Sequence, residues 1–174
     1  VIEYLNAATD PFTGNNNANT LINESQTVIN GNIGAANYDI GHTFSTGGGG
    51  LAGLGVVCTA AQKARGITGS PAPVGDAYDI DYVAHEMGHQ FGGYHTMNTC
   101  SRSGSGTTEV EPASGSSIMG YAGICSSNVQ AHSDDDFNYV NVRDISANVQ
   151  TGNSTCAFQT PLTNQPPTAD AGLD

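Results

Sequence analysis

The spacing of apolar residues predicts one well-defined amphipathic helix near the middle of the chain. Five apolar positions fall at i, i+3, i+4, i+7 and i+11, which places them along one face of a helix. These positions are Ile80, Val83, Ala84, Met87 and Phe91. Gly92 and Gly93 follow them, and glycine is the residue that helix C-termini favour. The pattern therefore predicts a helix over residues 79–91.

Shorter apolar runs predict a chain that mixes further helices with short strands. Thr20 and Glu24 resemble a capping pair at the start of a second helix. The other predicted helices cover residues 20–33 and about 134–149, and the predicted strands cover residues 1–5, 38–44, 51–57 and 64–68. Residues 98–117 are rich in Ser, Thr and Gly and predict a loop. We therefore expect an α/β (α+β) fold.

Composition changes this picture by excluding two classes of partner. Sixteen Asp and Glu residues against four Lys and Arg residues give a formal net charge of −12. Nucleic acids and anionic membrane surfaces both attract basic patches, so the chain is predicted to bind neither. No apolar run approaches the roughly 20 residues that a transmembrane helix needs. We expect a monomer whose partners are neither nucleic acids nor membranes.

The four cysteines indicate the compartment in which the protein works. Cys58, Cys100, Cys125 and Cys156 form no C-x-x-C pair, which argues against a zinc ribbon or a thioredoxin-type site. The scarcity of Lys and the Asn-rich loops favour a secreted, extracellular protein, in which four cysteines form two disulfides. The alternative is four buried thiols in a cytosolic protein. Spacing alone leaves the pairing open.

The central helix carries the motif that points to chemistry. His85-Glu86-Met87-Gly88-His89-Gln90-Phe91-Gly92-Gly93-Tyr94-His95 matches H-E-x-x-H-x-x-G-x-x-H at every fixed position. His85 and His89 lie one helical turn apart, so both imidazoles can reach one ion at about 2.0–2.1 Å. Gly92 permits the sharp turn that returns His95 as a third ligand. Three neutral imidazoles leave a fourth coordination position open, as catalytic zinc sites do.

Glu86 adjoins the first ligand and is predicted to take a proton from water on the metal. Chance histidines on an amphipathic helix are the alternative interpretation. Only five histidines occur in the chain, and three of them occupy motif positions, which argues against chance. The motif therefore predicts a hydrolytic zinc site.

This segment resembles the signature of the metzincin clan of zinc endopeptidases. The clan has a Met-containing turn downstream, and Ser117-Ile118-Met119-Gly120-Tyr121 is similar to it, 24 positions after His95. The resemblance implies that Met119 forms the apolar floor of the zinc site. It also implies that Tyr121 ligates zinc at rest or hydrogen-bonds the tetrahedral intermediate. An ordinary buried Met and a packing Tyr are the alternatives.

Within the clan, residues 1–158 resemble the reprolysin-like (adamalysin-like) family, particularly its secreted bacterial branch. The family implies a twisted, mostly parallel sheet with an antiparallel edge strand, an active-site helix, a backing helix, and an irregular C-terminal subdomain with the Met-turn. We expect the catalytic domain to cover residues 1–160. The family's first strand and long helix have no counterpart here, which implies a separate piece or a truncated chain. Residues 161–174 predict a linker, in which 164–172 resemble the start of a polycystic-kidney-disease-type β-sandwich.

The same resemblance assigns residues around the site. Gly53, Leu54 and Gly55 match the edge strand that pairs with the substrate. The family's cysteine pattern implies a Cys58–Cys156 disulfide, which leaves Cys100 and Cys125 to form the second one. A structural calcium ion is implied near Asp39. The run Asp134–Asp136 is better explained as a solvated helix start than as an ion site.

A specificity pocket is implied at residues 122–128, after the Met-turn. Ala122, Gly123 and Ile124 indicate an uncharged wall, so Ile124 is a predicted substrate contact and a hydrophobic substrate side chain is favoured.

The sequence therefore predicts a secreted zinc-dependent endopeptidase that cleaves protein or peptide substrates with a zinc-bound water activated by Glu86. One alternative is a binding module that keeps a metzincin-like fold, but such a protein has no need of the base Glu86. A second is a pappalysin-like metzincin, which shares the long zinc motif and the Met-x-Tyr turn. A Cys58–Cys156 linkage favours the reprolysin-like assignment.

Overall fold

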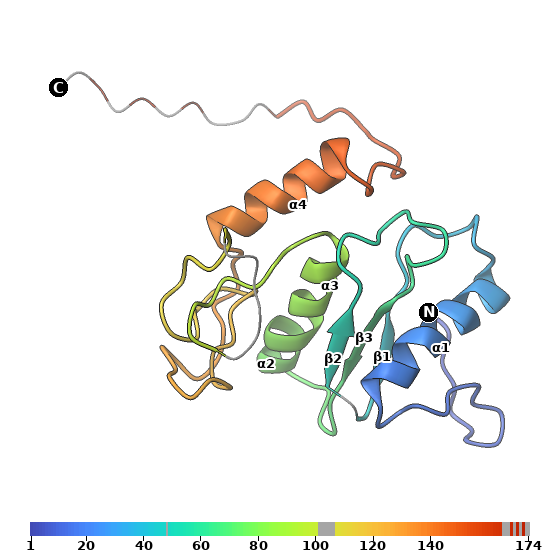
Figure 1. Ribbon diagram of the computed structural model, residues 1–174. Coiled ribbons are helices and arrows are strands. Elements are labelled where there is room, and N and C mark those ends of the chain that lie inside the picture. The colour runs from blue at the N-terminus through green and yellow to red at the C-terminus, as the bar shows by residue number, and fades with distance from the viewer. Residues whose placement is uncertain (48, 101–106, 165–167, 169, 171, 173–174) are drawn as a thin grey trace.

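A small mixed sheet lies between two helices in the computed structural model, which describes residues 1–47, 49–100, 107–164, 168, 170 and 172 (Figure 1). The strands are β1 (Thr43–Ser45), β2 (Gly50–Ala52) and β3 (Gly66–Gly69), in the order β1-β3-β2. β1 runs parallel to β3, and β2 runs antiparallel to it. The antiparallel edge strand implied by the family resemblance is therefore confirmed.

The strands are shorter than predicted because backbone groups near their ends bond to partners outside the sheet. Gly53 still donates to the Arg65 carbonyl, but Gly55 turns the chain with φ +61°. The amides of Val56 and Val57 then bind the carbonyl of Gln90, at the end of the central helix, in place of a neighbouring strand. The predicted strand over residues 1–5 is wrong, because this segment adopts no regular structure and its apolar side chains are largely exposed.

Helix α1 (Ala18–Ile33) backs the sheet and was predicted at 20–33. Asn17 caps it by accepting a hydrogen bond from the Thr20 amide, whereas Thr20 lies inside the helix. The predicted capping box is wrong, since the Glu24 carboxylate accepts instead from the amides of Thr13 and Gly14. Leu21 and Ile22 of α1 are buried against Ile67 of β3, and this cluster forms the core on one face of the sheet.

The opposite face carries the central helix. Three consecutive segments form it: α2 (Asp76–Tyr78), a π-helical turn η1 (Asp79–Ala84) and α3 (His85–Gln90). Successive residues of β3 point to opposite faces, so Ile67 meets α1 while Gly66 lies against the Gln90 side chain. A Cβ atom at position 66 would lie 2.3 Å from Gln90, and glycine there lets α3 approach the sheet closely.

The last helix, α4 (Tyr139–Thr151), begins later than its predicted start at 134. Asp134 and Asp136 use their backbone groups to pair with Ser116 and Ile118, so this run lies in an irregular loop and is not the start of a helix. Asn138 caps α4 by accepting from the Val140 amide. Between His95 and α4 the described residues form irregular loops with one isolated bridge, from Met97 to Glu111.

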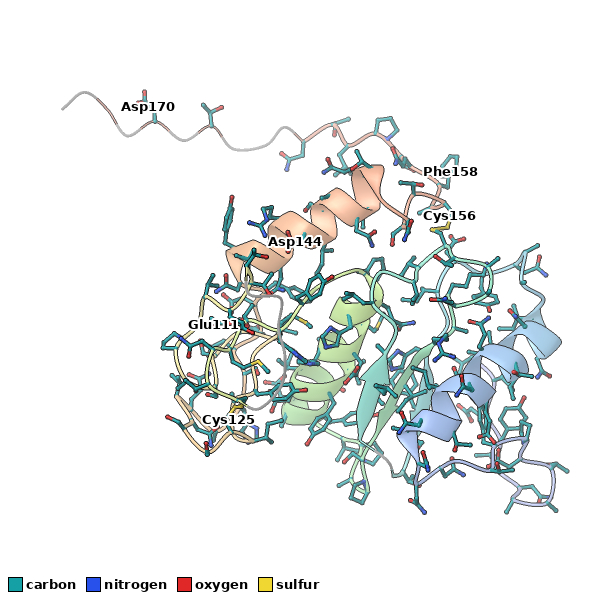
Figure 2. The ribbon with its side chains drawn as sticks, viewed as in Figure 1. Glu111, Cys125, Asp144, Cys156, Phe158 and Asp170 are labelled. Atoms are coloured by element: carbon teal, nitrogen blue, oxygen red, sulfur yellow. A yellow bond between two sulfur atoms is a disulfide. The ribbon has the colours of Figure 1, made fainter. Side chains whose placement is uncertain are left out.

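Two disulfides connect these parts, and both pairings predicted from the family resemblance are present. Cys58–Cys156 joins the segment after β2 to the chain that leaves α4, and Figure 2 shows Cys156 there. Cys100–Cys125 closes the loop region that follows His95. No helix among the described residues has the length and apolar character needed to cross a bilayer. The predicted β-sandwich start at 164–172 falls largely on residues outside the described part of the chain.

Candidate metal centre

Three imidazoles converge at the end of the central helix. The Nε2 atom of His95 lies 3.2 Å from that of His85 and 3.0 Å from that of His89. His85 and His95 are buried, and His89 is half-buried. Within the described residues, these three form the one group of three or more His, Cys, Asp or Glu side chains that could hold a metal ion.

The backbone explains how ligands from a helix and a loop meet. His85 and His89 lie on α3, one turn apart. The chain then reverses at Gly92, whose φ of +99° lies in the left-handed region that suits glycine. The Gly92 and Gly93 amides bond to the carbonyls of His89 and Gly88 and close the helix end. This turn returns His95 to the ion position, as the motif predicts.

Backbone carbonyls fix the tautomers of two ligands. The Nδ1 atom of His85 lies 2.7 Å from the Ile118 carbonyl oxygen, and the Nδ1 atom of His89 lies 2.7 Å from that of Gly93. A carbonyl oxygen only accepts, so each Nδ1 carries the proton and donates it. Each Nε2 is left with a lone pair directed at the shared centre. Such carbonyl contacts orient metal-binding histidines in proteins.

This arrangement fits zinc. Tetrahedral zinc with bonds of about 2.0–2.1 Å separates its nitrogen ligands by about 3.3–3.4 Å. The two Nε2 separations above are close to that value, and lone pairs that face each other at such distances repel unless a cation lies between them. Calcium prefers oxygen ligands, so it does not suit this set.

Glu86 follows the first ligand, and its carboxylate is enclosed by the edge strand. The side chain is 8% exposed. A Cβ atom built on Gly50 of β2 would lie 2.2 Å from Glu86 Oε1. The β2 backbone therefore passes directly over the carboxylate, and only a residue without a side chain fits there.

We expect Gly50→Ala to displace either Glu86 or β2. A misplacement of about 1 Å at a reacting group can lower turnover about 100-fold, so kcat should fall by about 10- to 100-fold with little loss of bound zinc. Peptidase assays paired with metal analysis check this. Gly31→Ala is the matched control, because a Cβ atom there would meet nothing within 4 Å beyond the backbone of its own helix. Equal activity of the two variants would contradict the expectation.

Two residues from the loop after His95 complete the surroundings. Met119 is fully buried, and its Sδ atom would lie 2.5 Å from a Cβ atom at Gly88, so it packs beneath α3 between the two helical ligands. The Tyr121 ring lies with its centroid 4.7 Å from the His95 ring and 5.4 Å from the His85 ring. The structure thus brings both predicted residues to the histidines.

A cleft of about 260 Å³ runs from these side chains to the sheet edge. Its lining residues are Gly50, Leu51, Ala52, Leu54, Glu86, His89, Tyr94, His95 and Tyr121. Of the three predicted substrate contacts on the edge strand, Leu54 lines the cleft. Gly53 and Gly55 instead donate their N–H groups internally, to the Arg65 and His89 carbonyls.

The remaining predicted site residues lie elsewhere. Ile124 is exposed and lines a neighbouring pocket. Asp39 is exposed, its carbonyl accepts from the Cys58 amide, and its side chain joins no metal-binding group within the described residues. A calcium ion near Asp39 therefore stays a prediction.

A family model described as metallo-peptidase family M12B, reprolysin-like, matches residues 1–151. The chain belongs to this family. A search of curated proteins returned no significant match.

Membership in the reprolysin-like family, together with the His triad, identifies the chain as a zinc metalloendopeptidase. It agrees with the Cys58–Cys156 disulfide and disfavours the pappalysin-like alternative. The alternative of a binding module without enzymatic activity is disfavoured for the same reason.

Sequence reasoning missed Glu111, which holds the loop that carries Ile118 next to the metal site of this reprolysin-like chain. Its carboxylate accepts from the amides of Ser116 and Ser117 and from the Ser117 hydroxyl, and Figure 2 shows it within the loop region beside α3. Burial acts to raise the pKa of Glu111, but these hydrogen bonds and one from Thr96 outweigh it and hold the pKa below its ordinary value. Ile118, which follows Ser117, supplies the carbonyl that orients His85.

Gln90 and His42 form a second support that the motif does not encode. Gln90 is fully buried; its amide donates to the Gly41 carbonyl, and its oxygen accepts from Nδ1 of His42. Nε2 of His42 accepts from the Thr68 hydroxyl. Burial lowers the pKa of His42, and the opposing effect of the Gln90 bond is smaller. A neutral polar network thus fixes the end of α3 to the segment before β1 and to β3.

Proposed function

We propose that this reprolysin-like chain is a secreted endopeptidase in which Glu86 is the general base. The observation that carries the proposal is the position of the Glu86 carboxylate. It lies in the same cleft as His89 and His95 and is held under β2 by the close approach of Gly50. A carboxylate kept in place without ligating the metal suits proton transfer.

The residues divide the chemistry among themselves. Bound zinc would supply Lewis acidity, which acidifies water and polarises a carbonyl. Glu86 removes a proton from the attacking water as its oxygen bonds to the scissile carbon. The same carboxyl then delivers that proton to the leaving amine nitrogen as the C–N bond breaks. Tyr121 donates its phenolic hydrogen to the developing oxyanion, and Met119 provides the apolar floor beneath the histidines.

The free edge of β2 supports a substrate that binds in extended form. On the side of β2 that faces β3, the Gly53 amide donates to the Arg65 carbonyl and the Gly49 carbonyl accepts from the Gly69 amide. Alternate residues of an antiparallel strand point their backbone groups to opposite sides, so Gly50 and Ala52 direct theirs toward the cleft. A peptide that pairs with them lies along the row from Glu86 to Tyr121.

Secretion is supported by chemistry outside the site. Two disulfides persist in oxidising compartments and are rare in the cytosol. The scarcity of Lys and Arg in an acidic chain agrees with a soluble extracellular peptidase. The proposal extends to the secreted bacterial branch of the family.

Removal of the metal tests the proposed activity directly. We expect the full chain to cleave internal bonds of a proteome-derived peptide library, to lose this activity on treatment with a zinc chelator, and to regain it when zinc is restored. Mass spectrometry of the products reports whether cleavage is internal. Undiminished cleavage by protein whose zinc content has fallen to zero would refute the proposal.

A further inference from the structure

A second pocket, of about 270 Å³, adjoins the cleft. Tyr121 lines both, so the two cavities share a wall beside the metal centre. One wall is the segment after Met119, with Ala122 and Ile124, as the family resemblance implies. The facing wall comes from residues 70–82, which sequence reasoning did not connect with the site.

The facing wall carries a fixed carboxylate. Asp81 lies on η1, and its side chain is 14% exposed. One carboxylate oxygen accepts from the Ser133 amide at 2.7 Å, and the other lies 2.9 Å from Nδ1 of His132. These two contacts join η1 to the lining residues His132 and Ser133 and hold the carboxylate in the pocket lining. Each carboxylate oxygen has two lone pairs, so both can still accept from a ligand.

The chemistry of the pocket is therefore amphipathic. Val74, Ala122 and Ile124 offer apolar surface, and Tyr82 offers an aromatic ring. Among the described residues that line the pocket, Asp81 is the one that bears a formal charge when His132 is counted as neutral. A long aliphatic stem that ends in a cation satisfies both features, because the stem covers apolar surface while its head meets the carboxylate.

We propose that Asp81 selects lysine or arginine in the substrate residue that follows the cleaved bond. This inference rests on the proposed endopeptidase function. A peptide that lies along β2 with its scissile bond at Glu86 places the next side chain beyond Tyr121, in this pocket. The preference differs from the hydrophobic one predicted from residues 122–124, because the opposite wall contributes the charge.

Paired peptides test the selection in the wild-type enzyme. Lysine and norleucine share the same stem and differ by the ammonium group. We expect kcat/KM to be at least about tenfold higher for the lysine peptide, since a hydrogen bond between two charged groups is stronger than one between neutral groups. Equal or faster cleavage of the norleucine peptide would overturn the inference without reference to any variant.

Asp81→Asn identifies the residue responsible. The carboxamide keeps an oxygen for the Ser133 amide but removes the charge, so the lysine-to-norleucine ratio of kcat/KM should fall by about 10- to 100-fold. Asp134→Asn is the matched control, since it removes one charge from the loop that contacts Asp81 but lies outside the pocket lining, and its ratio should equal that of the wild type. An unchanged ratio in Asp81→Asn would overturn the assignment.

The two proposals fail in different ways. If zinc-loaded wild-type protein cleaves no peptide of any kind, the endopeptidase function is refuted, and the inference falls with it. If it cleaves peptides with a flat or hydrophobic preference at this position, the function stands and the role of Asp81 alone is refuted.

Discussion

Glu86→Gln should leave the metal centre loaded and lower peptide hydrolysis by about 100- to 10,000-fold, the range that general bases contribute. The carboxamide has nearly the size of the carboxylate, so it fits under Gly50 without moving β2. It cannot accept the proton of the attacking water, and it cannot return that proton to the leaving amine. The loss should therefore appear in kcat, with KM changed little.

Zinc analysis of the purified variant, paired with kcat and KM on one peptide, separates this effect from metal loss. Glu3→Gln is a control for the same chemical change at an exposed position outside the cleft lining. Turnover of Glu86→Gln within a few fold of the wild type would exclude Glu86 as the base, whatever the metal content.

Removal of the Cys58–Cys156 disulfide by a double Cys→Ser substitution should cost about 2–5 kcal/mol of folding free energy. The bond joins residues 98 apart in sequence and closes most of the domain into one loop. The segment before Cys58 is also held by the Gln90 carbonyl at the end of α3. At about 2–4 °C per kcal/mol for a chain of this size, Tm should fall by about 4–20 °C.

The second disulfide supplies the comparison. Cys100–Cys125 spans 25 residues, so the chain-entropy relation assigns it about 1 kcal/mol less stabilisation. Scanning calorimetry of both double variants should place Tm of the Cys58/Cys156 variant lower. The reverse order, or no change in either variant, would show that loop closure does not govern the stability of this domain.

The parts of the site that follow local rules were predictable from sequence. Helical periodicity places His85 and His89 one turn apart, and the need for a left-handed turn explains Gly92, so the metal ligands follow from spacing. The disulfides needed a family resemblance, because four cysteines permit three pairings.

Other parts of the fold and the site could not be predicted, because they depend on contacts that a local sequence pattern does not encode. Val56 and Val57 have strand-like side chains, yet their amides find the Gln90 carbonyl, and residues 1–5 have the composition of a strand without a described partner. Asp81 was missed because its partners are far away in sequence, and Glu111 because its partners, five and six residues on, lie in an irregular loop that no periodic pattern describes. Glu111 holds Ser116 and Ser117, while Asp81 reaches His132, 51 residues away.

The orientation of His85 has a thermodynamic consequence. The carbonyl that fixes its tautomer belongs to Ile118, 33 residues later, in the loop that Glu111 holds closed. Opening of that loop releases the imidazole, so loop closure and metal binding are coupled, and each favours the other by the same free energy. Any change that makes the loop easier to open must weaken metal binding by the corresponding free energy, and a bound metal must make the loop harder to open. Resistance of this loop to cleavage by other peptidases therefore depends on metal supply.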